Sequence, residues 1–217
     1  MVFPKVAARE SGTVIPQRES VMPTHGEIFD FIYRNDVWLG GSGTGSREDV
    51  TREYREFLIQ FMQAARITSV VDLGCGDWQF SRHIDWGGID YTGVDASAVV
   101  LENTGKFARP GVRFLHANAM TDALPAADLL IVKDVLQHWS NDDILTFLPQ
   151  LQNYKGALIT NSFPPGGEGF LNGEMRTGAN YRPVDLLRAP FNLPGRYVFD
   201  FMGDEPKKVF LWRRPTR

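Results

Sequence analysis

The sequence predicts an α/β fold in which helices cover both faces of a mixed, mostly parallel sheet. From residue 68 onward, short apolar runs alternate with segments that are long enough for a crossover helix. This alternation is typical of a parallel sheet that is buried on both sides. The last two apolar runs, RYVFDFMG and KKVFLWRR, are joined only by DEP. That connection is too short for a crossover, so it predicts an antiparallel hairpin.

The composition fits one globular domain and disfavours several classes of partner. The chain has 217 residues, of which 43% are hydrophobic and 23% charged, and its formal net charge is −3. Such a charge gives no chain-wide attraction to nucleic acid or to an anionic membrane. Cys75 is the only cysteine, so neither an internal disulfide nor a thiolate metal cluster is expected. No apolar stretch has the length of a membrane span or a signal peptide, which predicts a cytoplasmic protein.

The first 66 residues are predicted to precede the sheet. Residues 1–23 show no periodicity and are predicted to form a flexible arm. Residues 24–66 are predicted to form two helices around a glycine-rich loop, with Thr24 as the N-cap of the first helix. The apolar positions expected to face inward are Ile28, Phe29, Phe31 and Ile32 in the first helix and Val50, Tyr54, Phe57, Leu58, Phe61 and Met62 in the second.

Residues 67–217 are predicted to form the core of the domain. Parallel strands are expected at 69–74, 90–95, 112–118, 127–134 and 156–162, with crossover helices at 77–86, 96–107 and 141–154. The hairpin strands are expected at 196–203 and 207–214. The segment at about 163–195 is too long for a plain connection in a compact domain, so it is predicted to be a substrate-binding insertion.

A glycine turn follows the first strand, in the run VVDLGCG at 70–76. Gly74 and Gly76 allow the backbone to turn sharply and to approach a ligand where a Cβ would collide. Asp95 ends the second strand, near the roughly 20-residue spacing expected of an acid that binds ribose hydroxyls. These residues predict that a nucleoside binds at the carboxyl ends of the strands.

The residues around the turn distinguish between nucleoside ligands. A dinucleotide turn reads G-x-G-x-x-G, but Gln79 occupies the third glycine position, and the P-loop pattern is absent here. Asp72 precedes the turn, and its charge disfavours a phosphate while it favours a cationic ligand. S-adenosylmethionine has an ammonium group, a sulfonium centre and a ribose but no phosphate. It is therefore the nucleoside that fits these residues.

Four successive segments carry a family resemblance: VVDLGCGDWQFSRHI, YTGVDAS, LHANAMTDALP and ADLLIVKDVLQHWS. They resemble the nucleotide-binding segments of class I S-adenosylmethionine-dependent methyltransferases of the small-molecule type, over roughly residues 68–162. The resemblance implies a Rossmann-like seven-stranded sheet of order 3-2-1-4-5-7-6 with strand 7 antiparallel, and S-adenosyl-L-methionine as cofactor with S-adenosyl-L-homocysteine as product. The cofactor-binding residues that it implies are Asp72, Gly74 and Gly76 at the methionine end, Asp95 and Ala96 at the ribose, Asn118 and Ala119 at the adenine, and Lys133 near the methyl group.

Aromatic and small residues beside the glycine sequences are predicted to complete the site. The glycine-rich loop is interpreted as a lid, in which Trp38 and Ser42 close over the cofactor and Tyr33 contacts the substrate. A flexible loop between two helices is the alternative. Asp77 and Trp78 are predicted to contact the substrate directly after the turn. Trp78 stands where the family often has a small residue, so its ring is expected to close over a ligand.

The sequence KDVLQHWS follows the fourth strand and supplies the predicted catalytic residues. A hydroxyl or ammonium acceptor must lose a proton, and His138 titrates in the useful range, so His138 is predicted to be the base, with Asp134 beside it. Gln137 is predicted to contact the substrate. The alternative is that His138 starts a helix and binds backbone. No grouping of His, Asp and Glu has the spacing of metal ligands, so no metal is expected.

The insertion predicts the character of the acceptor. Its side chains are mainly polar and charged, which favours a polar small molecule or a glycan that is methylated on oxygen or nitrogen. Tyr181 and Arg182 are predicted to bind this acceptor, although Arg182 could instead pair with Asp185 across a turn. Two other functions remain open from the sequence: methylation of a protein, and cofactor binding without catalysis by a partner protein.

Overall fold

A computed structural model of the chain describes residues 22–215. Seven strands form one sheet in the order β3-β2-β1-β4-β5-β7-β6, and β7 is antiparallel to both of its neighbours, which confirms the predicted topology. The predicted arm at 1–23 lies almost wholly outside the described residues. No helix among residues 22–215 is long and apolar enough to span a bilayer.

The strands and helices lie where the alternation of apolar runs predicts them, with one exception. The strands are β1 (Ser69–Leu73), β2 (Asp90–Asp95), β3 (Val112–His116), β4 (Ala127–Lys133), β5 (Tyr154–Ser162), β6 (Arg196–Met202) and β7 (Pro206–Arg213). The α-helices are α1 (His25–Arg34), α2 (Arg52–Ala64), α3 (Ala98–Thr104) and α4 (Asn141–Phe147).

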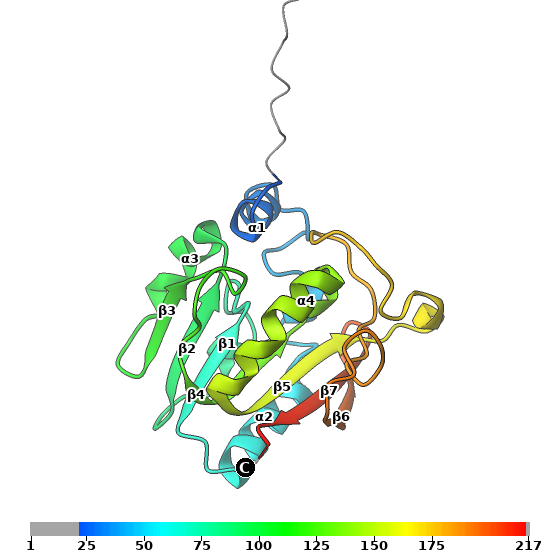
Figure 1. Cartoon of the computed structure of the whole chain (residues 1–217). Helices are drawn as coiled ribbons and strands as arrows, with labels where there is room; N and C mark the ends of the chain where they lie inside the picture. Colours follow the sequence, from blue (N-terminus) through cyan, green and yellow to red (C-terminus); the bar gives the residue numbers. More distant parts are fainter. Residues whose placement is uncertain (1–21, 216–217) are drawn as a thin grey trace, which may run out of the picture.

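The central strands are apolar on both faces because helices cover both faces of the sheet. Along β4, Leu130 and Val132 belong to the hydrophobic cluster that includes α4, whereas the alternate residues Leu129 and Ile131 belong to the cluster that includes α2. Figure 1 shows α4 crossing one face, with α2 behind the other. The sheet is therefore rigid at its centre, which fixes the carboxyl ends of β1, β2 and β4 relative to one another.

Helix α1 begins at the predicted N-cap. The Thr24 Oγ1 atom accepts from the Glu27 N–H, while the Glu27 carboxylate accepts from the Thr24 N–H, which forms a capping box. Ile32 is buried as predicted, but Phe31 is 61% exposed and does not face inward. The Asp30 carboxylate accepts from the Ser97 hydroxyl at 2.7 Å and so holds α1 over the start of α3 (Figure 1).

The predicted helix at 77–86 is wrong. Only a 3₁₀ turn, Ser81–His83, lies between β1 and β2. The apolar residues of this segment, Trp78, Phe80, Ile84 and Trp86, are all buried, although their spacing of two, four and two residues does not form one helical face. Trp78 also has a φ of 62°, a left-handed conformation that no α-helix contains. The segment therefore follows the sheet surface as an irregular chain that buries each large side chain in turn.

The other two crossovers and the insertion differ in how regular they are. Helix α3 spans most of the predicted 96–107 segment, whereas the 141–154 segment divides into α4 and a 3₁₀ helix at Leu148–Asn153 that contains Pro149. Residues 163–195 contain no strand and no α-helix, only the 3₁₀ turn Gly167–Phe170. The insertion is held by side-chain hydrogen bonds, and it lies beside the carboxyl ends of β4 and β5.

Candidate active site

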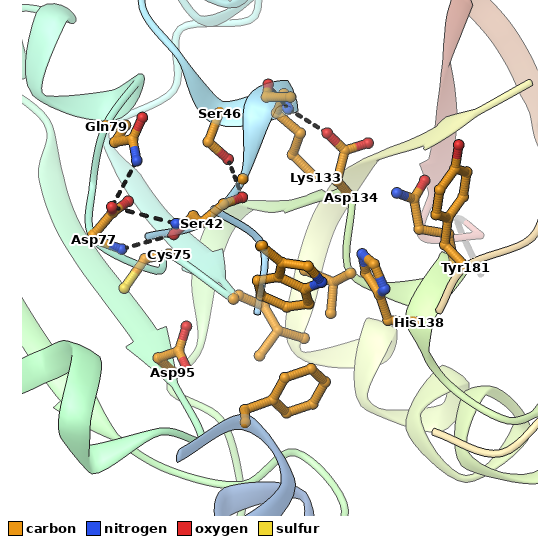
Figure 2. A pocket seen from close by; sticks show the side chains of 18 of the residues that line it. Ser42, Ser46, Cys75, Asp77, Gln79, Asp95, Lys133, Asp134, His138 and Tyr181 are labelled. Atoms are coloured by element: carbon orange, nitrogen blue, oxygen red, sulfur yellow. Dashed lines mark hydrogen bonds and ion pairs between the residues drawn. The ribbon is translucent and has the colours of Figure 1, made fainter. Parts of the chain in front are cut away.

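A cavity of about 870 Å³ opens at the carboxyl ends of the central strands. Most of the residues predicted for the site lie on its wall, although they come from six separate parts of the chain (Figure 2). The predicted residues on the wall are Tyr33, Trp38, Ser42, Gly74, Asp77, Asp95, Ala96, Asn118, Ala119, Lys133, Asp134, Gln137, His138 and Tyr181. Four predicted residues do not line the cavity: Asp72, Gly76, Trp78 and Arg182.

The glycine turn brings the first strand close to two other segments. Both Gly74 and Gly76 have positive φ angles, 72° and 54°. A Cβ on Gly74 would lie 2.4 Å from the Val135 Cγ2 atom, and a Cβ on Gly76 would lie 2.1 Å from the Ser42 Oγ atom. Gly76 therefore makes room for the glycine-rich loop, while Gly74 reaches the cavity wall.

Gly76→Ala is expected to destabilise the fold and displace this loop, because the new Cβ meets Ser42 and Tyr33 in addition to the strained φ. Gly88→Ala is a matched control, since Gly88 has a φ of +79° but nothing within 4 Å of the added Cβ. Urea unfolding should show a larger loss for Gly76→Ala than for Gly88→Ala, by about 1–2 kcal/mol. Adding Ser42→Gly to Gly76→Ala should recover part of the excess. Equal losses at both glycines would contradict the contact.

Asp95 is buried on the cavity wall and oriented by two backbone donors. Its two carboxylate oxygens accept from the Gly76 and Ser97 N–H groups, each at 2.9 Å. Burial raises the pKa of Asp95 from 3.8 to about 6, and the backbone hydrogen bonds partly oppose this. Each carboxylate oxygen has room for a second hydrogen bond. The Asp95 carboxylate is therefore fixed in place and still able to accept from a ligand.

Asp72 is not on the cavity wall, contrary to the direct contact predicted for it. Its side chain points to the face of the sheet on which Tyr91 and α2 lie. There, one carboxylate oxygen accepts from the Tyr91 hydroxyl at 2.6 Å and from the Ser81 hydroxyl at 2.9 Å. Burial raises the pKa of Asp72 from 3.8 to about 6. Because this pKa lies above its ordinary value, the folded protein binds the proton more tightly than the unfolded chain does. The ionised carboxylate therefore costs stability at pH 7. This cost begins to fall as the pH drops through 6, and it is gone only below the ordinary pKa of 3.8.

Asp72→Asn is accordingly expected to raise the free energy of unfolding at pH 7 by about 2 kcal/mol, because the amide is neutral and its oxygen still accepts from both hydroxyls. The gain should shrink at pH 5. Urea unfolding at the two pH values measures both effects. Ser81→Ala, which removes one hydroxyl and keeps the charge, should instead lower stability. A loss of stability in Asp72→Asn at pH 7 would contradict the burial cost.

The Trp78 ring lies in the core and does not line the cavity. Its side chain is 1% exposed and packs among Tyr91, Phe107 and Phe114, with ring centroids 5.3–5.8 Å from its own. The left-handed conformation at Trp78 turns the ring away from the cavity and into the core. A large residue therefore stands at this position because its ring packs in the hydrophobic core.

Four charged residues, of which the two lysines are buried, form a network at the ends of β4 and β7. Lys133 donates to Asp134 at 2.5 Å and Lys207 donates to the other Asp134 oxygen at 3.1 Å, while Lys207 also pairs with Asp204 at 3.1 Å. The two ammonium groups hold the pKa of Asp134 below its ordinary value, although burial alone would raise it. With both oxygens engaged by cations, Asp134 is a poor proton acceptor. The sequence prediction missed Lys207 and Asp204, although the strand order places the β6–β7 turn at the crevice.

We name residues 38–46 the strap, because they cross the cavity and contact three of its walls. Trp38 donates from its indole nitrogen to the Ala179 carbonyl at 3.1 Å, and Ser42 accepts at its hydroxyl from the Asp77 N–H at 3.0 Å. At its far end, Thr44 donates to Asp204 at 2.7 Å and the Gly45 carbonyl accepts from Lys133 at 2.8 Å. Figure 2 shows Ser42 between Asp77 and the rest of the cavity.

His138 has the hydrogen bonding of a neutral base. Its Nδ1 atom lies 3.0 Å from the Asn180 carbonyl, which can only accept, so Nδ1 carries the proton. The Nε2 atom has no hydrogen-bond partner among residues 22–215. It is not fully buried, so a ligand can reach it. Burial lowers the pKa of His138 below 6.5, so the ring is neutral at pH 7. The Trp38 ring lies 5.1 Å away between centroids.

Arg182 is structural, but it does not pair with Asp185. Its guanidinium donates to the Gly173, Leu136 and Gln137 carbonyls and, at 2.7 Å, to Asn141. Asp185 instead pairs with Arg188. The sequence of the insertion contains many polar and charged residues. Of these, only Asn180 and Tyr181 line the cavity. Gln137 lies on the wall, yet its side-chain oxygen accepts from the Ser162 N–H at 2.8 Å and holds β5.

Comparison with known proteins identifies a family and a fold. The sequence profile of a family described as "O-methyltransferase domain" matches residues 17–167. Uncharacterized methyltransferases of Mycobacterium bovis and Mycobacterium tuberculosis are 36% identical over 105 residues, which cover 45% of this chain and 46% of each relative. The match thus spans about half the length of these curated relatives.

Solved structures support the same fold at low sequence identity. Human N-acetylserotonin methyltransferase in complex with SAM has a TM-score of 0.59 at 17% identity, over 88% of this chain and 59% of that protein. The N-methyltransferase NodS of Bradyrhizobium japonicum, in complex with S-adenosyl-L-homocysteine, has a TM-score of 0.61 at 13% identity, over 85% of this chain and 98% of NodS. At such identities the likeness concerns the fold.

Proposed function

This chain belongs to the O-methyltransferase family, and from that premise we propose that it transfers the methyl group of S-adenosylmethionine to a hydroxyl oxygen of a small molecule. The observation that carries the proposal is the neutral imidazole of His138, which faces the same cavity as the buried carboxylate of Asp95. The proposal thus assigns an acid for the ribose and a base for a hydroxyl to the wall of one cavity.

The cavity wall fits a cationic nucleoside. Asp95 would accept from the ribose hydroxyls, with Ala96, Asn118 and Ala119 beside the adenine. Asp77 has one carboxylate oxygen that is buried without a hydrogen-bond partner among the described residues, while its other oxygen accepts from the Ser42 N–H and the Gln79 amide. A buried carboxylate oxygen in this state favours a cationic donor. We therefore assign Asp77, rather than Asp72, to the ammonium group of the cofactor, with Gly74 beside it.

His138 would act as the base for the acceptor. When bound, S-adenosylmethionine supplies a methyl group that is electrophilic because it is attached to a sulfonium. The Asn180 carbonyl fixes the proton on Nδ1, so Nε2 is the atom that can take the proton of a hydroxyl. The negative charge of Asp134 favours the imidazolium that forms, without Asp134 itself accepting a proton. The strap, whose Trp38 ring lies 5.1 Å from the His138 ring, would limit the access of water to this region.

The shape of the wall favours a small, planar acceptor over a glycan. Five of the rings on the cavity wall form a connected group around Trp38, with neighbouring centroids 5.1–6.1 Å apart: Phe29, Tyr33, Trp38, His138 and Tyr181. Such a wall stacks well on a flat ring. Apart from Asn180 and Tyr181, the polar side chains of the insertion on which a glycan acceptor was expected, including Arg182, lie outside the cavity.

Two measurements test the proposal. Isothermal titration calorimetry should detect binding of S-adenosylhomocysteine, and no binding of NADH or ATP at the same concentrations. A methyl-transfer assay with radiolabelled S-adenosylmethionine against hydroxylated aromatic compounds should then give labelled product. Binding without transfer to any acceptor would favour a non-catalytic partner protein, and transfer to protein instead would favour a protein methyltransferase.

A further inference from the structure

One part of the cavity is not used by the cofactor assignment above. It lies between the insertion and the β6–β7 turn, where Tyr181, Asp204, Glu205 and Lys207 line the wall. The Tyr181 ring is 6.1 Å from that of His138 between centroids, so this region adjoins the base. Figure 2 shows Tyr181 beside His138, on the side away from Asp95. An acceptor whose hydroxyl lies at His138 would place its remaining groups here.

The cations on the cavity wall are already paired. Lys207 has three N–H groups, and it donates to Asp134, Asp204 and the Ser162 hydroxyl at 2.8–3.1 Å. Lys133 donates to Asp134 and to the Gly45 carbonyl. Arg47, the third cation of the wall, pairs with Asp49 at 3.0 Å. No wall cation is therefore left beside Tyr181 to bind an acidic group of the acceptor.

Glu205, unlike these cations, has no partner of opposite charge among residues 22–215. Its carboxylate accepts from the Tyr181 hydroxyl at 2.9 Å. The wall as a whole carries five carboxylates (Asp77, Asp95, Asp134, Asp204 and Glu205) and three cations (Arg47, Lys133 and Lys207). This surplus of negative charge attracts cations into the cavity. Glu205 is the acid that adjoins the region left for the acceptor.

We propose that Glu205, oriented by Tyr181, selects an acceptor that carries a basic nitrogen, and that the acceptor is a planar hydroxylated amine. The amine binds the Glu205 carboxylate, the ring stacks against Tyr181 and Trp38, and the hydroxyl reaches His138. This inference rests on the proposed function, because it assigns a substrate class to the same cavity. It excludes acceptors in which a carboxylate or phosphate takes the place of the amine.

Three phenols with a two-carbon substituent at the 4-position test the charge preference: tyramine, 4-ethylphenol and, as the anionic phenol, 4-hydroxyphenylacetate. Their affinities are measured by calorimetry on the full chain saturated with S-adenosylhomocysteine. Tyramine should bind at least 10-fold more tightly than the anionic phenol, with the neutral phenol between them. In Glu205→Gln the advantage of tyramine should fall several-fold while the affinity for 4-ethylphenol is unchanged. Tyr181→Phe, which keeps the ring and removes the hydroxyl, should reduce the advantage less.

Glu168→Gln is the matched control, since Glu168 is an exposed acid of the insertion that does not line the cavity. It should leave the order of the three phenols and their ratios as in the wild type. If tyramine binds the complex no more tightly than the other two phenols, the inference is overturned. The same holds if none of the three phenols binds. Failure of S-adenosylhomocysteine to bind at all would instead overturn the proposed function, so the two failures are distinguishable.

Discussion

Asp95→Ala is expected to weaken the binding of S-adenosylhomocysteine by roughly 100-fold, or about 2.8 kcal/mol. The carboxylate is buried on the wall, and the Gly76 and Ser97 N–H groups fix its orientation. Hydrogen bonds from ribose hydroxyls to such a charged acceptor contribute about 1.5–3 kcal/mol each. Titration calorimetry at pH 7.5, where Asp95 is ionised, measures the loss. Because burial raises the pKa of Asp95 to about 6, wild-type affinity should also decline as the pH falls below 6.

Two controls separate this loss from unfolding. Asp142→Ala removes an exposed acid that does not line the cavity, and it should leave the affinity unchanged. Asp95→Asn keeps an oxygen for one of the two backbone donors and should lose affinity while its circular dichroism spectrum stays native. If a folded Asp95→Ala protein binds S-adenosylhomocysteine as tightly as the wild type, the ribose assignment is wrong.

His138→Ala is expected to lower kcat by about 10²–10⁴-fold, the range in which a positioned base contributes to proton transfer. Affinity for S-adenosylhomocysteine should change little, because the ring lies at the acceptor end of the cavity. The pH dependence provides a second readout. Burial lowers the pKa of His138 below 6.5, so the wild-type rate should fall only at pH values below 6.5, where the ring becomes protonated.

The acid limb of this pH profile should be missing from the residual activity of His138→Ala. His83→Ala is the matched control, since His83 lies on the 3₁₀ turn after β1 and does not line the cavity. It should keep both the rate and the pH profile of the wild type. Turnover in His138→Ala that equals the wild type would leave the histidine with a structural role only, bound to the Asn180 carbonyl.

The sheet could be predicted from the sequence because each strand is specified by residues that are close together in the chain. Apolar runs separated by crossover-length segments specify the parallel strands, and the three-residue link before β7 specifies the antiparallel hairpin. The cavity residues at strand ends, such as Asp95 and Lys133, follow from the same pattern, since the carboxyl ends of parallel strands meet at one edge.

The errors concern side chains whose direction depends on distant contacts. Trp78 was expected at the ligand, but its left-handed backbone and the surrounding rings place it in the core. Arg182 was expected at the acceptor or at Asp185, but its donors meet carbonyls from two other segments. Asp72 has the expected position in sequence, yet Tyr91 and Ser81 turn its carboxylate inward. In each case the partner lies on another element, which sequence spacing does not specify.

The contact between Gly76 and the strap has a consequence for how this sequence can diverge. An added methyl group at 76 would occupy the space that the Ser42 hydroxyl fills, with 2.1 Å between the two atoms. We therefore expect mutations at these two positions not to be independent in evolution: a side chain at 76, which the φ of 54° already disfavours, costs less where position 42 has lost its own. In an alignment of close homologues, we expect the two positions to covary, with glycine retained at one or the other.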